Sequence, residues 1–364
     1  MRVAVDLRCL LEPFESGVTV YTKAMVDEFL QCPELELDLF YQTRRPFNKI
    51  HESYPQARWI PYSSTRFHVQ SLWDSLPLPK NYFPLQPDLI WLPDRRPFYK
   101  TKIPVVMTVH DQVPERERGS LSLKSRVWHR LFSLRRLERF CAGFLFPSLT
   151  VAYSVYTALP WEVTYEGAKL VSGEEKPKEL PSGASDFVLS LAPLDPRKRL
   201  NWVFEMAHAF PKTMFVCAGI KLHDSRFSSF TLPKFPNLFY LSSFTEQEKS
   251  WLLRYAKVLL AVSMDEGFDL PVLEAVKAKT PVILSDIPVH QELYKNAIFV
   301  KDLNGLRAAL YSALEGHGKV PIPRGRYDWE KAAQRALLFF GRVLLHKDRQ
   351  GGRHGHSHDH AHNA

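Results

Sequence analysis

The sequence predicts an α/β protein of two doubly wound, Rossmann-like domains. Apolar runs of strand length alternate with helical patterns along most of the 364 residues, as in parallel sheets covered on both faces. The length suits two domains of about 150 residues each. A charged stretch rich in Pro, Gly and Ser, residues 173–185, is the predicted linker. Ligands of such sheets bind where the strands end, so we expect the active site in a central cleft that both domains face.

The second domain, residues 186–326, shows the alternation most clearly. Its predicted strands are 187–191, 214–218, 238–241, 258–262, 281–284 and 297–300. Its predicted helices are 200–210, 246–256, 271–277, 289–294 and 303–314. The second of these helices starts with a capping box, Thr245-Glu246-Gln247-Glu248, in which Thr and Glu can satisfy the first amides. A last helix, within residues 327–346, is expected to cross back to the first domain.

The first domain, residues 1–172, repeats this pattern less regularly. Its predicted strands are 3–6, 35–41, 58–60, 88–92, 105–109 and 143–146. A Pro-rich stretch, residues 76–97, interrupts the alternation and is predicted to be loop. At the other end of the chain, residues 347–364 form a His-rich tail that we expect to be disordered. Such a tract binds divalent metals in almost any conformation, and it is either an affinity tail or a native end.

Composition places the chain among ordinary globular proteins, with 45% hydrophobic and 24% charged residues. The four cysteines are scattered without C-x-x-C spacing, which favours reduced thiols over disulfides or metal sites. The first residues read as a strand and lack the apolar core of a signal peptide. No run approaches the roughly 20 apolar residues of a membrane span. We therefore expect a cytoplasmic protein.

The net charge of +9 is concentrated in residues 116–139, where basic side chains interleave with apolar ones. This pattern predicts a basic amphipathic helix. Its apolar stripe could pack on its own domain, or the helix could contact an anionic membrane or an acidic acceptor. Membrane contact would make the protein peripheral at the inner face of the membrane. A nucleic-acid partner is not expected, because no motif that reads DNA or RNA is present.

The most informative segment is 263–275, which joins an apolar strand to a helix that a proline opens. Glu266 lies in the loop, and Glu274 lies on the first turns of the helix. The arrangement places backbone amides, the positive end of a helix dipole and two carboxylates around one pocket. A sugar attached to a nucleoside diphosphate is a ligand that needs all three. The alternative is a loop acid and an exposed helix acid without function.

Three other segments follow predicted strands and could serve the same ligand. Gly17 and Val18 would offer backbone amides to a phosphate at a helix start. His110 would point into the crevice, unless the backbone satisfies its ring. Arg197 and Lys198 would neutralise a diphosphate, with Arg binding it bidentately and Lys acting as a point charge. Cations oppose the dipole at a helix start, and this conflict favours an anionic ligand.

These segments together resemble the retaining glycosyltransferases of family 4, which have the two-domain GT-B fold. The resemblance covers almost the whole chain up to about residue 346. The segments that match the family's motifs are Glu266-Gly267-Phe268-Asp269-Leu270-Pro271-Val272-Leu273-Glu274 (E-x7-E), Thr280-Pro281-Val282-Ile283-Leu284-Ser285 (T-P-V-V-x-S), Asp195-Pro196-Arg197-Lys198 (E-P-R-K), Val109-His110-Asp111 (I-H-D), Ser16-Gly17-Val18 (G-V-G) and Tyr327-Asp328-Trp329 (F-S-W).

The resemblance implies a role for each matching residue. Glu274 would bind the ribose of the donor, and His110 would lie against the transferred sugar. The implied donor-binding residues are Gly17, Val18, Arg197, Lys198, Glu266, Gly267, Phe268, Asp269, Leu270 and Glu274, and the implied catalytic residues are His110, Glu266 and Lys198. The co-substrate would be a GDP- or UDP-sugar, with no further cofactor. A metal is not expected, because the chain contains no Asp-x-Asp pair.

The resemblance further implies a retaining hexosyltransferase, with mannose favoured, that acts on a glycan or lipid-linked acceptor in polysaccharide or lipopolysaccharide synthesis. The chain departs from the family at Asp269, where Gly is usual, and at Thr19, which replaces the second Gly of the G-V-G turn. These departures keep a rival open: a non-catalytic carbohydrate-binding or scaffold protein of the same fold. Another GT-B activity, such as a nucleotide-sugar epimerase, is a third alternative.

Overall fold

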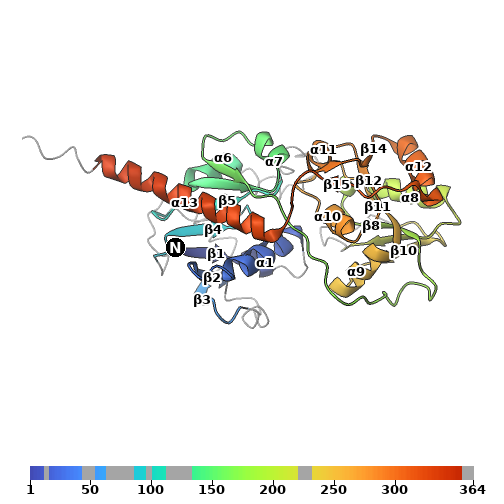
Figure 1. The fold of residues 1–364 in the computed structure, drawn as a ribbon, viewed down its shortest axis with the longest axis horizontal. Helices are drawn as coiled ribbons and strands as arrows, with labels where there is room; N and C mark the ends of the chain where they lie inside the picture. The colour runs from blue at the N-terminus through green and yellow to red at the C-terminus, as the bar shows by residue number, and fades with distance from the viewer. Residues whose placement is uncertain are drawn as a thin grey trace, which may run out of the picture. The chain divides into compact units, whose positions relative to one another are not determined.

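The computed structural model describes residues 1–11, 16–42, 54–62, 86–95, 101–111, 133–219 and 232–354. These residues form two compact units, drawn in Figure 1. The first unit combines Met1–Tyr165 with Trp329–Ala364, and the second unit is Glu166–Asp328. Each unit is a parallel sheet with helices packed on it, so the predicted class of two Rossmann-like α/β domains is confirmed.

The sheet of the first unit has seven parallel strands in the order β3-β2-β1-β4-β5-β6-β7. The strands are β1 (Arg2–Asp6), β2 (Glu36–Gln42), β3 (Arg58–Tyr62), β4 (Leu89–Leu92), β5 (Val105–Thr108), β6 (Gly143–Phe146) and β7 (Trp161–Val163). The winding reverses at β1, where Val3 pairs with Leu37 of β2 on one side and with Leu89 of β4 on the other. Sheets of this topology bind ligands at that reversal, beyond the carboxyl ends of the strands.

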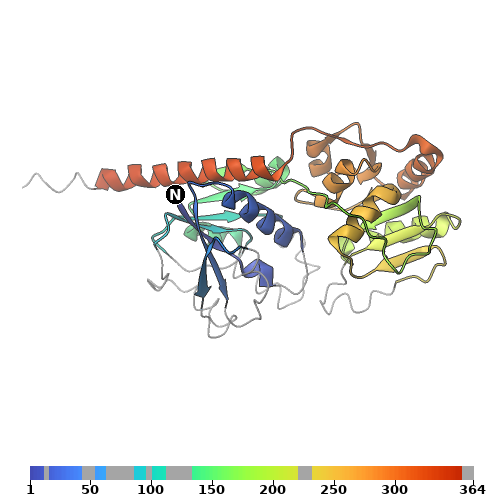
Figure 2. The same ribbon diagram turned by 60° about the horizontal axis from the view of Figure 1, so that its bottom comes forward.

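Helix α1 (Gly17–Leu30) and the last helix of the chain, α13 (Trp329–His354), belong to the same unit. Figure 2 shows α13 lying along the first sheet beside α1. The rings of Phe29 and Phe340 are 6.1 Å apart, and Arg335 donates a hydrogen bond of 3.2 Å to the carbonyl of Val163. The other helices among the described residues of this unit are short: η1 (Arg8–Leu11), α6 (Leu134–Leu137), η3 (Glu138–Phe140) and α7 (Leu149–Ser154).

Gly143 in β6 shows how closely α13 approaches the sheet. A Cβ atom at this position would lie 2.6 Å from Cζ of Phe339 and 2.9 Å from the carbonyl oxygen of Pro160. Real Cβ atoms do not come that close to other atoms, so a larger residue would push the helix away. Phe339 and Phe340 are both fully buried. The core of the first unit is therefore completed by the end of the chain.

The sheet of the second unit has six parallel strands in the order β10-β9-β8-β11-β12-β14. The strands are β8 (Phe187–Leu191), β9 (Phe215–Ala218), β10 (Leu238–Leu241), β11 (Ala256–Ala261), β12 (Val282–Ser285) and β14 (Ile298–Val300). A short antiparallel pair is added by β13 (Tyr294–Lys295) and β15 (Ile322–Pro323). The helices are η4 (Pro196–Lys198), α8 (Leu200–Ala209), α9 (Glu246–Tyr255), α10 (Leu270–Lys277), α11 (Pro288–Leu293), α12 (Leu303–Ser312) and η5 (Ala313–His317).

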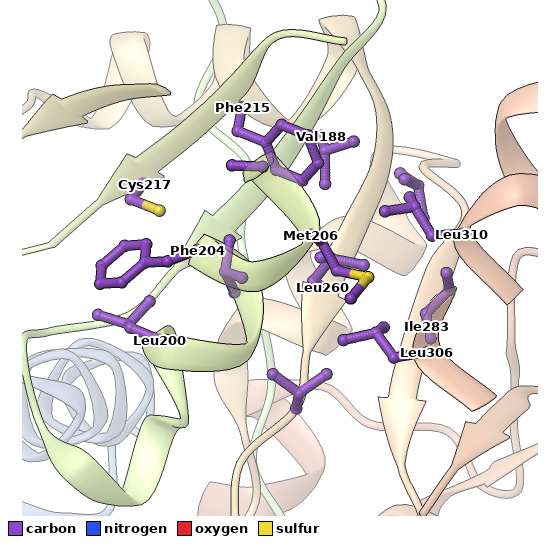
Figure 3. Packing of buried hydrophobic residues seen from close by; sticks show 14 of the residues in the cluster. Val188, Leu200, Phe204, Met206, Phe215, Cys217, Leu260, Ile283, Leu306 and Leu310 are labelled. Carbon is purple, nitrogen blue, oxygen red and sulfur yellow. The ribbon is translucent and has the colours of Figure 1, made fainter. Parts of the chain in front are cut away.

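One core of the second unit packs α8 and α12 on the same sheet, as Figure 3 shows. Leu200, Phe204 and Met206 come from α8, and Leu306 and Leu310 come from α12. They meet side chains of four strands: Val188, Phe215, Cys217, Leu260 and Ile283. Burying each large apolar side chain contributes about 1.5–3 kcal/mol. This packing holds β8 and β11 in register and so fixes the loops that follow them.

The stretch 173–185, the predicted linker, packs against the second unit. Glu174 forms an ion pair with Arg254 of α9, and the amide of Glu175 donates to the carbonyl of Gln247 at 3.5 Å. Leu180 is buried. Because of these contacts, the boundary between the units falls between Tyr165 and Glu166.

Most of the basic segment 116–139 lies outside the described residues, as do parts of the Pro-rich stretch 76–97 and residues 355–364 of the His-rich tail. The end of the basic segment forms α6 and the start of η3. α13 continues to His354, beyond the predicted end at residue 346, because no proline follows Leu345 to stop it. In the part of the chain that the structure describes, none of the helices is both long and apolar enough to cross a bilayer.

Candidate functional site

The site lies at the winding reversal of the second sheet, between β8 and β11. β8 leads through residues 192–195 into η4, and β11 leads through residues 262–269 into α10. The two loops are tied together by a hydrogen bond of 2.7 Å from the amide of Met264 to the carbonyl of Arg197. The loops carry most of the residues that the sequence predicts for the donor.

The loop after β8 turns two cations in different directions. Asp195 caps η4 by accepting a 2.9 Å hydrogen bond from the amide of Arg197, and its carboxylate also binds the Arg197 guanidinium at 2.8–2.9 Å. Arg199 ends the turn in the left-handed region, with φ at 48°. Arg197 is therefore held by Asp195, whereas Lys198 extends toward the loop after β11.

Lys198 forms a short ion pair with Glu266, and both side chains are nearly buried. Burial alone would lower the pKa of Lys198, but the negative charges of Glu266 and Asp269 outweigh it and raise the pKa, so the side chain is an ammonium. Burial raises the pKa of Glu266, and the charge of Lys198 and a hydrogen bond from Ser263 offset part of that effect. A nearly buried ammonium between acids, in the short helix that follows β8, is suited to exchange a carboxylate for a phosphate.

Asp269 occupies a left-handed backbone position, with φ at 68°, immediately before α10. Its carboxylate is 4% exposed and lies 3.0 Å from Nε2 of His290. Burial would raise the pKa of Asp269, but the charge of Lys198 and the hydrogen bond from His290 outweigh burial and lower it. Asp269 is therefore a second buried carboxylate beside Lys198.

Glu274 faces a buried cation that the sequence did not single out. Its Oε1 lies 2.8 Å from Nζ of Lys249 in α9, and Nζ also lies 2.9 Å from Glu246. Burial raises the pKa of Glu274, and Lys249 opposes that rise. Burial would lower the pKa of Lys249, but Glu274 and Glu246 raise it. The carboxylate predicted to bind ribose is thus oriented by a fixed ion pair.

The remaining residues of the loop after β11 are packed. Phe268 is 3% exposed, and its ring lies edge-on to the ring of Tyr327 at 5.5 Å. The hydroxyl of Tyr327 contacts the carbonyl of Leu293 at 3.4 Å. Leu270 is buried at the start of α10, and Gly267 lies between Glu266 and Phe268. This packing fixes the loop that carries the two acids.

The other predicted residues belong to the first unit. Gly17 and Val18 open α1, where Ser16 caps the helix by accepting from the amide of Thr19 at 3.3 Å. His110 follows β5, and its Nε2 lies 2.9 Å from the carbonyl of Pro93. A carbonyl only accepts, so Nε2 of His110 carries a proton.

The structure thus brings Lys198, Glu266 and Asp269 into one cluster, with Glu274 on the helix that follows. Two partners were missed by the sequence analysis. Lys249 could have been suspected, because it stands three residues after Glu246 on a helix and must find a counterion if buried. His290 gave no signal, because only the fold brings it to Asp269.

The fold defines a class: an α/β protein with the GT-B fold, whose second domain carries this cluster of charges. Residues 172–312 match the family described as "Glycosyl transferases group 1". The match lies within the second unit, where it agrees with the resemblance to the glycosyltransferases of family 4.

Solved structures agree with the fold. Sucrose-phosphate synthase from Thermosynechococcus elongatus aligns with a TM-score of 0.65 and 15% identity, over 97% of this chain and 98% of that chain. The lipopolysaccharide outer core galactosyltransferase WaaB aligns with a TM-score of 0.51 and 13% identity, over 95% of this chain and 100% of that chain. At these identities the likeness shows the GT-B fold.

Similarity to curated proteins is confined to short segments. The chain is 42% identical to the O-antigen chain mannosyltransferase RfbU of Salmonella typhimurium over 62 residues, which are 17% of this chain and 18% of that protein. It is 39% identical to the serotype-specific mannosyltransferase WbdA of Escherichia coli over 56 residues, 15% of this chain and 7% of that protein. The matched segments therefore span less than a fifth of either relative.

Proposed function

We propose that the chain is a retaining hexosyltransferase that moves a sugar from a GDP- or UDP-sugar to a glycan or lipid-linked acceptor. The observation that carries the proposal is the buried ammonium of Lys198, held by Glu266 at the winding reversal of the second sheet. A ligand with two negative phosphates gains most from such a cation in a site of low dielectric. Glu274, oriented by Lys249, would accept hydrogen bonds from the ribose hydroxyls.

In the proposed reaction the bond from the anomeric carbon to the diphosphate breaks as the acceptor oxygen bonds to the same face of that carbon. The acceptor hydroxyl loses its proton to the departing phosphate, so no side chain forms a covalent bond. Lys198, with Arg197, would stabilise the negative charge on the leaving group without a metal. His110 would contact the transferred sugar. Trapping a glycosyl adduct on Glu266 would overturn this mechanism.

Mannose and cell-surface polysaccharide synthesis are the favoured substrate and pathway class. The support is the similarity over 56–62 residues to two proteins named as mannosyltransferases, together with the GT-B fold shared with a lipopolysaccharide galactosyltransferase. A cytoplasmic enzyme whose 116–139 segment contacts the anionic inner face of a membrane would meet a lipid-linked acceptor there.

A donor screen tests the proposal. Thermal unfolding is measured with GDP-mannose, other GDP-sugars, UDP-sugars and ADP-sugars, and hydrolysis of each donor is followed. We expect one donor class to raise the Tm of the wild type and to be hydrolysed slowly. The Glu274→Ala variant should lose this stabilisation, and Glu205→Ala, an exposed glutamate of α8, should keep it.

The rival function is a non-catalytic carbohydrate-binding protein of the same fold. Asp269 and Thr19, which replace glycines usual in the family, favour it. Stabilisation by free glycans, with no effect of any nucleotide, would establish the rival. Product analysis with the bound donor would reveal an epimerase, because the sugar would then change without transfer.

A further inference from the structure

His290 of α11 is fully buried and lies beside the donor cluster, yet it belongs to none of the motifs considered above. Its Nε2 is 3.0 Å from the carboxylate of Asp269. Its Nδ1 is 2.9 Å from the carbonyl oxygen of Ser285 and 3.4 Å from the Ser285 hydroxyl. The imidazole thus joins the end of β12 to Asp269, the residue immediately before α10.

These contacts determine which nitrogens of the His290 ring carry protons. A carbonyl oxygen only accepts, so the short contact to Ser285 requires a proton on Nδ1. An ionised carboxylate also only accepts, so the contact to Asp269 requires a proton on Nε2. Assigned from its partners, His290 is an imidazolium paired with the Asp269 carboxylate.

This pairing changes what Lys198 can do. Lys198 lies within electrostatic reach of two carboxylates, Glu266 and Asp269. Without a second cation the cluster would hold two negative charges and one positive charge, and it would repel a diphosphate. With the His290 imidazolium the charges balance before the donor arrives. Lys198 then has one carboxylate, Glu266, to exchange for a phosphate.

The pair also holds the backbone. Asp269 has φ at 68°, a conformation that glycine adopts freely and that Asp tolerates better than most residues. Its side chain makes no hydrogen bond that caps α10 and is turned instead toward His290. The amide of Val272 bonds to the carbonyl of Asp269 at 3.0 Å. The ion pair therefore anchors the turn that aims the first amides of α10.

We propose that His290 is a positioning residue of the donor site, which neutralises Asp269 so that Lys198 stays available to a nucleoside diphosphate. This inference rests on the proposed function and deepens it, because it explains how the chain tolerates a carboxylate beside an anionic donor. It predicts that replacing His290 weakens nucleotide binding only while residue 269 carries a charge.

The test is a double-mutant cycle read by calorimetric titration with GDP, UDP and GDP-mannose. In His290→Gln the Asp269 charge competes for Lys198, and we expect the Kd of the nucleotide that binds the wild type to rise at least tenfold. In the double variant Asp269→Asn/His290→Gln no charge remains to be neutralised. We expect its Kd to return to within about threefold of the wild-type value.

Tyr294→Phe is the matched control, because Tyr294 is buried, lies within electrostatic reach of Asp269, and its hydroxyl has no hydrogen-bond partner among the described residues. Its affinity should equal that of the wild type. A purely structural role for His290 would lower the Tm and the affinity together and would leave the double variant no better than the single one. That result overturns the inference.

Should His290→Gln fail to fold, the comparison of Asp269→Asn with the double variant carries the test. Equal affinities support the inference, and a tenfold loss on adding His290→Gln to Asp269→Asn overturns it. Nitrogen chemical shifts after histidine-selective labelling should show His290 as an imidazolium at pH 7 in the wild type. If the wild type binds no nucleotide, the proposed function is overturned as well. If His290→Gln binds nucleotide as tightly as the wild type, this inference alone is overturned.

Discussion

The carboxyl ends of the two sheets share one topology and differ in chemistry. In the first unit, the residues around the winding reversal are mostly aromatic: the ring of Tyr21 lies edge-on to Trp91, His110 and Trp329 at 4.7–6.0 Å. In the second unit the same place holds a charge network of Lys198, Glu266, Asp269 and His290. The fold supplies the position of a site, and the loops after the strands decide what it binds.

This difference in chemistry implies that the two units contact different parts of the substrate. A charge network suits the anionic part of a donor, and a partly exposed histidine supported by buried aromatic rings suits the hydroxyls of a sugar. Variants in the second unit should therefore change nucleotide binding first. Variants at His110 in the first unit should change transfer while leaving nucleotide binding intact.

Lys198→Ala should give the largest effect. It leaves the Glu266 carboxylate without its ammonium and removes the cation proposed to bind the diphosphate, so we expect kcat/KM to fall about 10³-fold. The free energy of unfolding in urea should fall by about 3–5 kcal/mol. Lys212→Ala, at an exposed lysine of the same unit, is the control. A kcat/KM within tenfold of the wild type would contradict the role given to the cluster.

His110→Ala should come next, with kcat/KM reduced about 10²-fold and the Kd for free nucleotide unchanged. The comparison variant is Tyr21→Phe, which keeps the ring beside His110 and removes the hydroxyl that lies 3.4 Å from the Thr108 hydroxyl. Titration and steady-state kinetics separate the two quantities. If nucleotide binding fell together with kcat/KM, the division between the units would be wrong.

Lys249→Met should weaken donor binding about tenfold, which corresponds to about 1.4 kcal/mol. Burial already raises the pKa of Glu274, and loss of the cation would raise it further, so the carboxyl would be protonated more often. Since rising pH ionises the carboxyl again, the affinity of the variant should improve between pH 6 and pH 9. The affinities of the wild type and of Lys295→Met, a variant at an exposed lysine of β13, should not change over that pH range.

Alkaline unfolding should show a smaller effect of the same lysine. The pKa of Lys249 is raised in the folded protein because the two glutamates outweigh burial. Its ion pairs therefore contribute stability below the unfolded pKa of about 10.4, and this contribution is lost as the pH rises through the folded pKa. Between pH 9 and pH 11, urea titrations should show a larger loss of unfolding free energy for the wild type than for Lys249→Met. An equal loss in both proteins would contradict the stabilising role of the Lys249 ion pairs.

Gly17→Ala should have the smallest effect. A Cβ at Gly17 meets nothing within 4 Å, and Gly17 is not among the residues with positive φ. Alanine keeps the amide that the phosphate would use and lowers the entropy of the unfolded chain, so stability should rise by about 0.4–1 kcal/mol. Donor affinity should stay within about twofold. A large loss of affinity would show that the ligand approaches this turn too closely for a methyl group.

The fold was predictable because buried parallel strands leave a local signal, an unbroken apolar run ending at a turn. The E-x7-E segment was readable for the same reason, since its loop and helix start are continuous in the chain. The ion pairs Lys249–Glu274 and His290–Asp269 were not, because each joins residues that only the tertiary fold brings together. The engagement of Arg197 by Asp195 was also hidden, although the two are neighbours, because a sequence does not reveal rotamers.

The contact between Gly143 and Phe339 has a consequence for how the protein folds during synthesis. The strands of the first unit are synthesised first, but the helix that covers them is synthesised only after the whole second unit. Until then, the surface that receives Phe339 and Phe340 is open to water and to other nascent chains. The second unit is continuous in the chain and can fold before the first unit receives α13. A premature stop codon before α13 would therefore leave the core of the first unit incomplete.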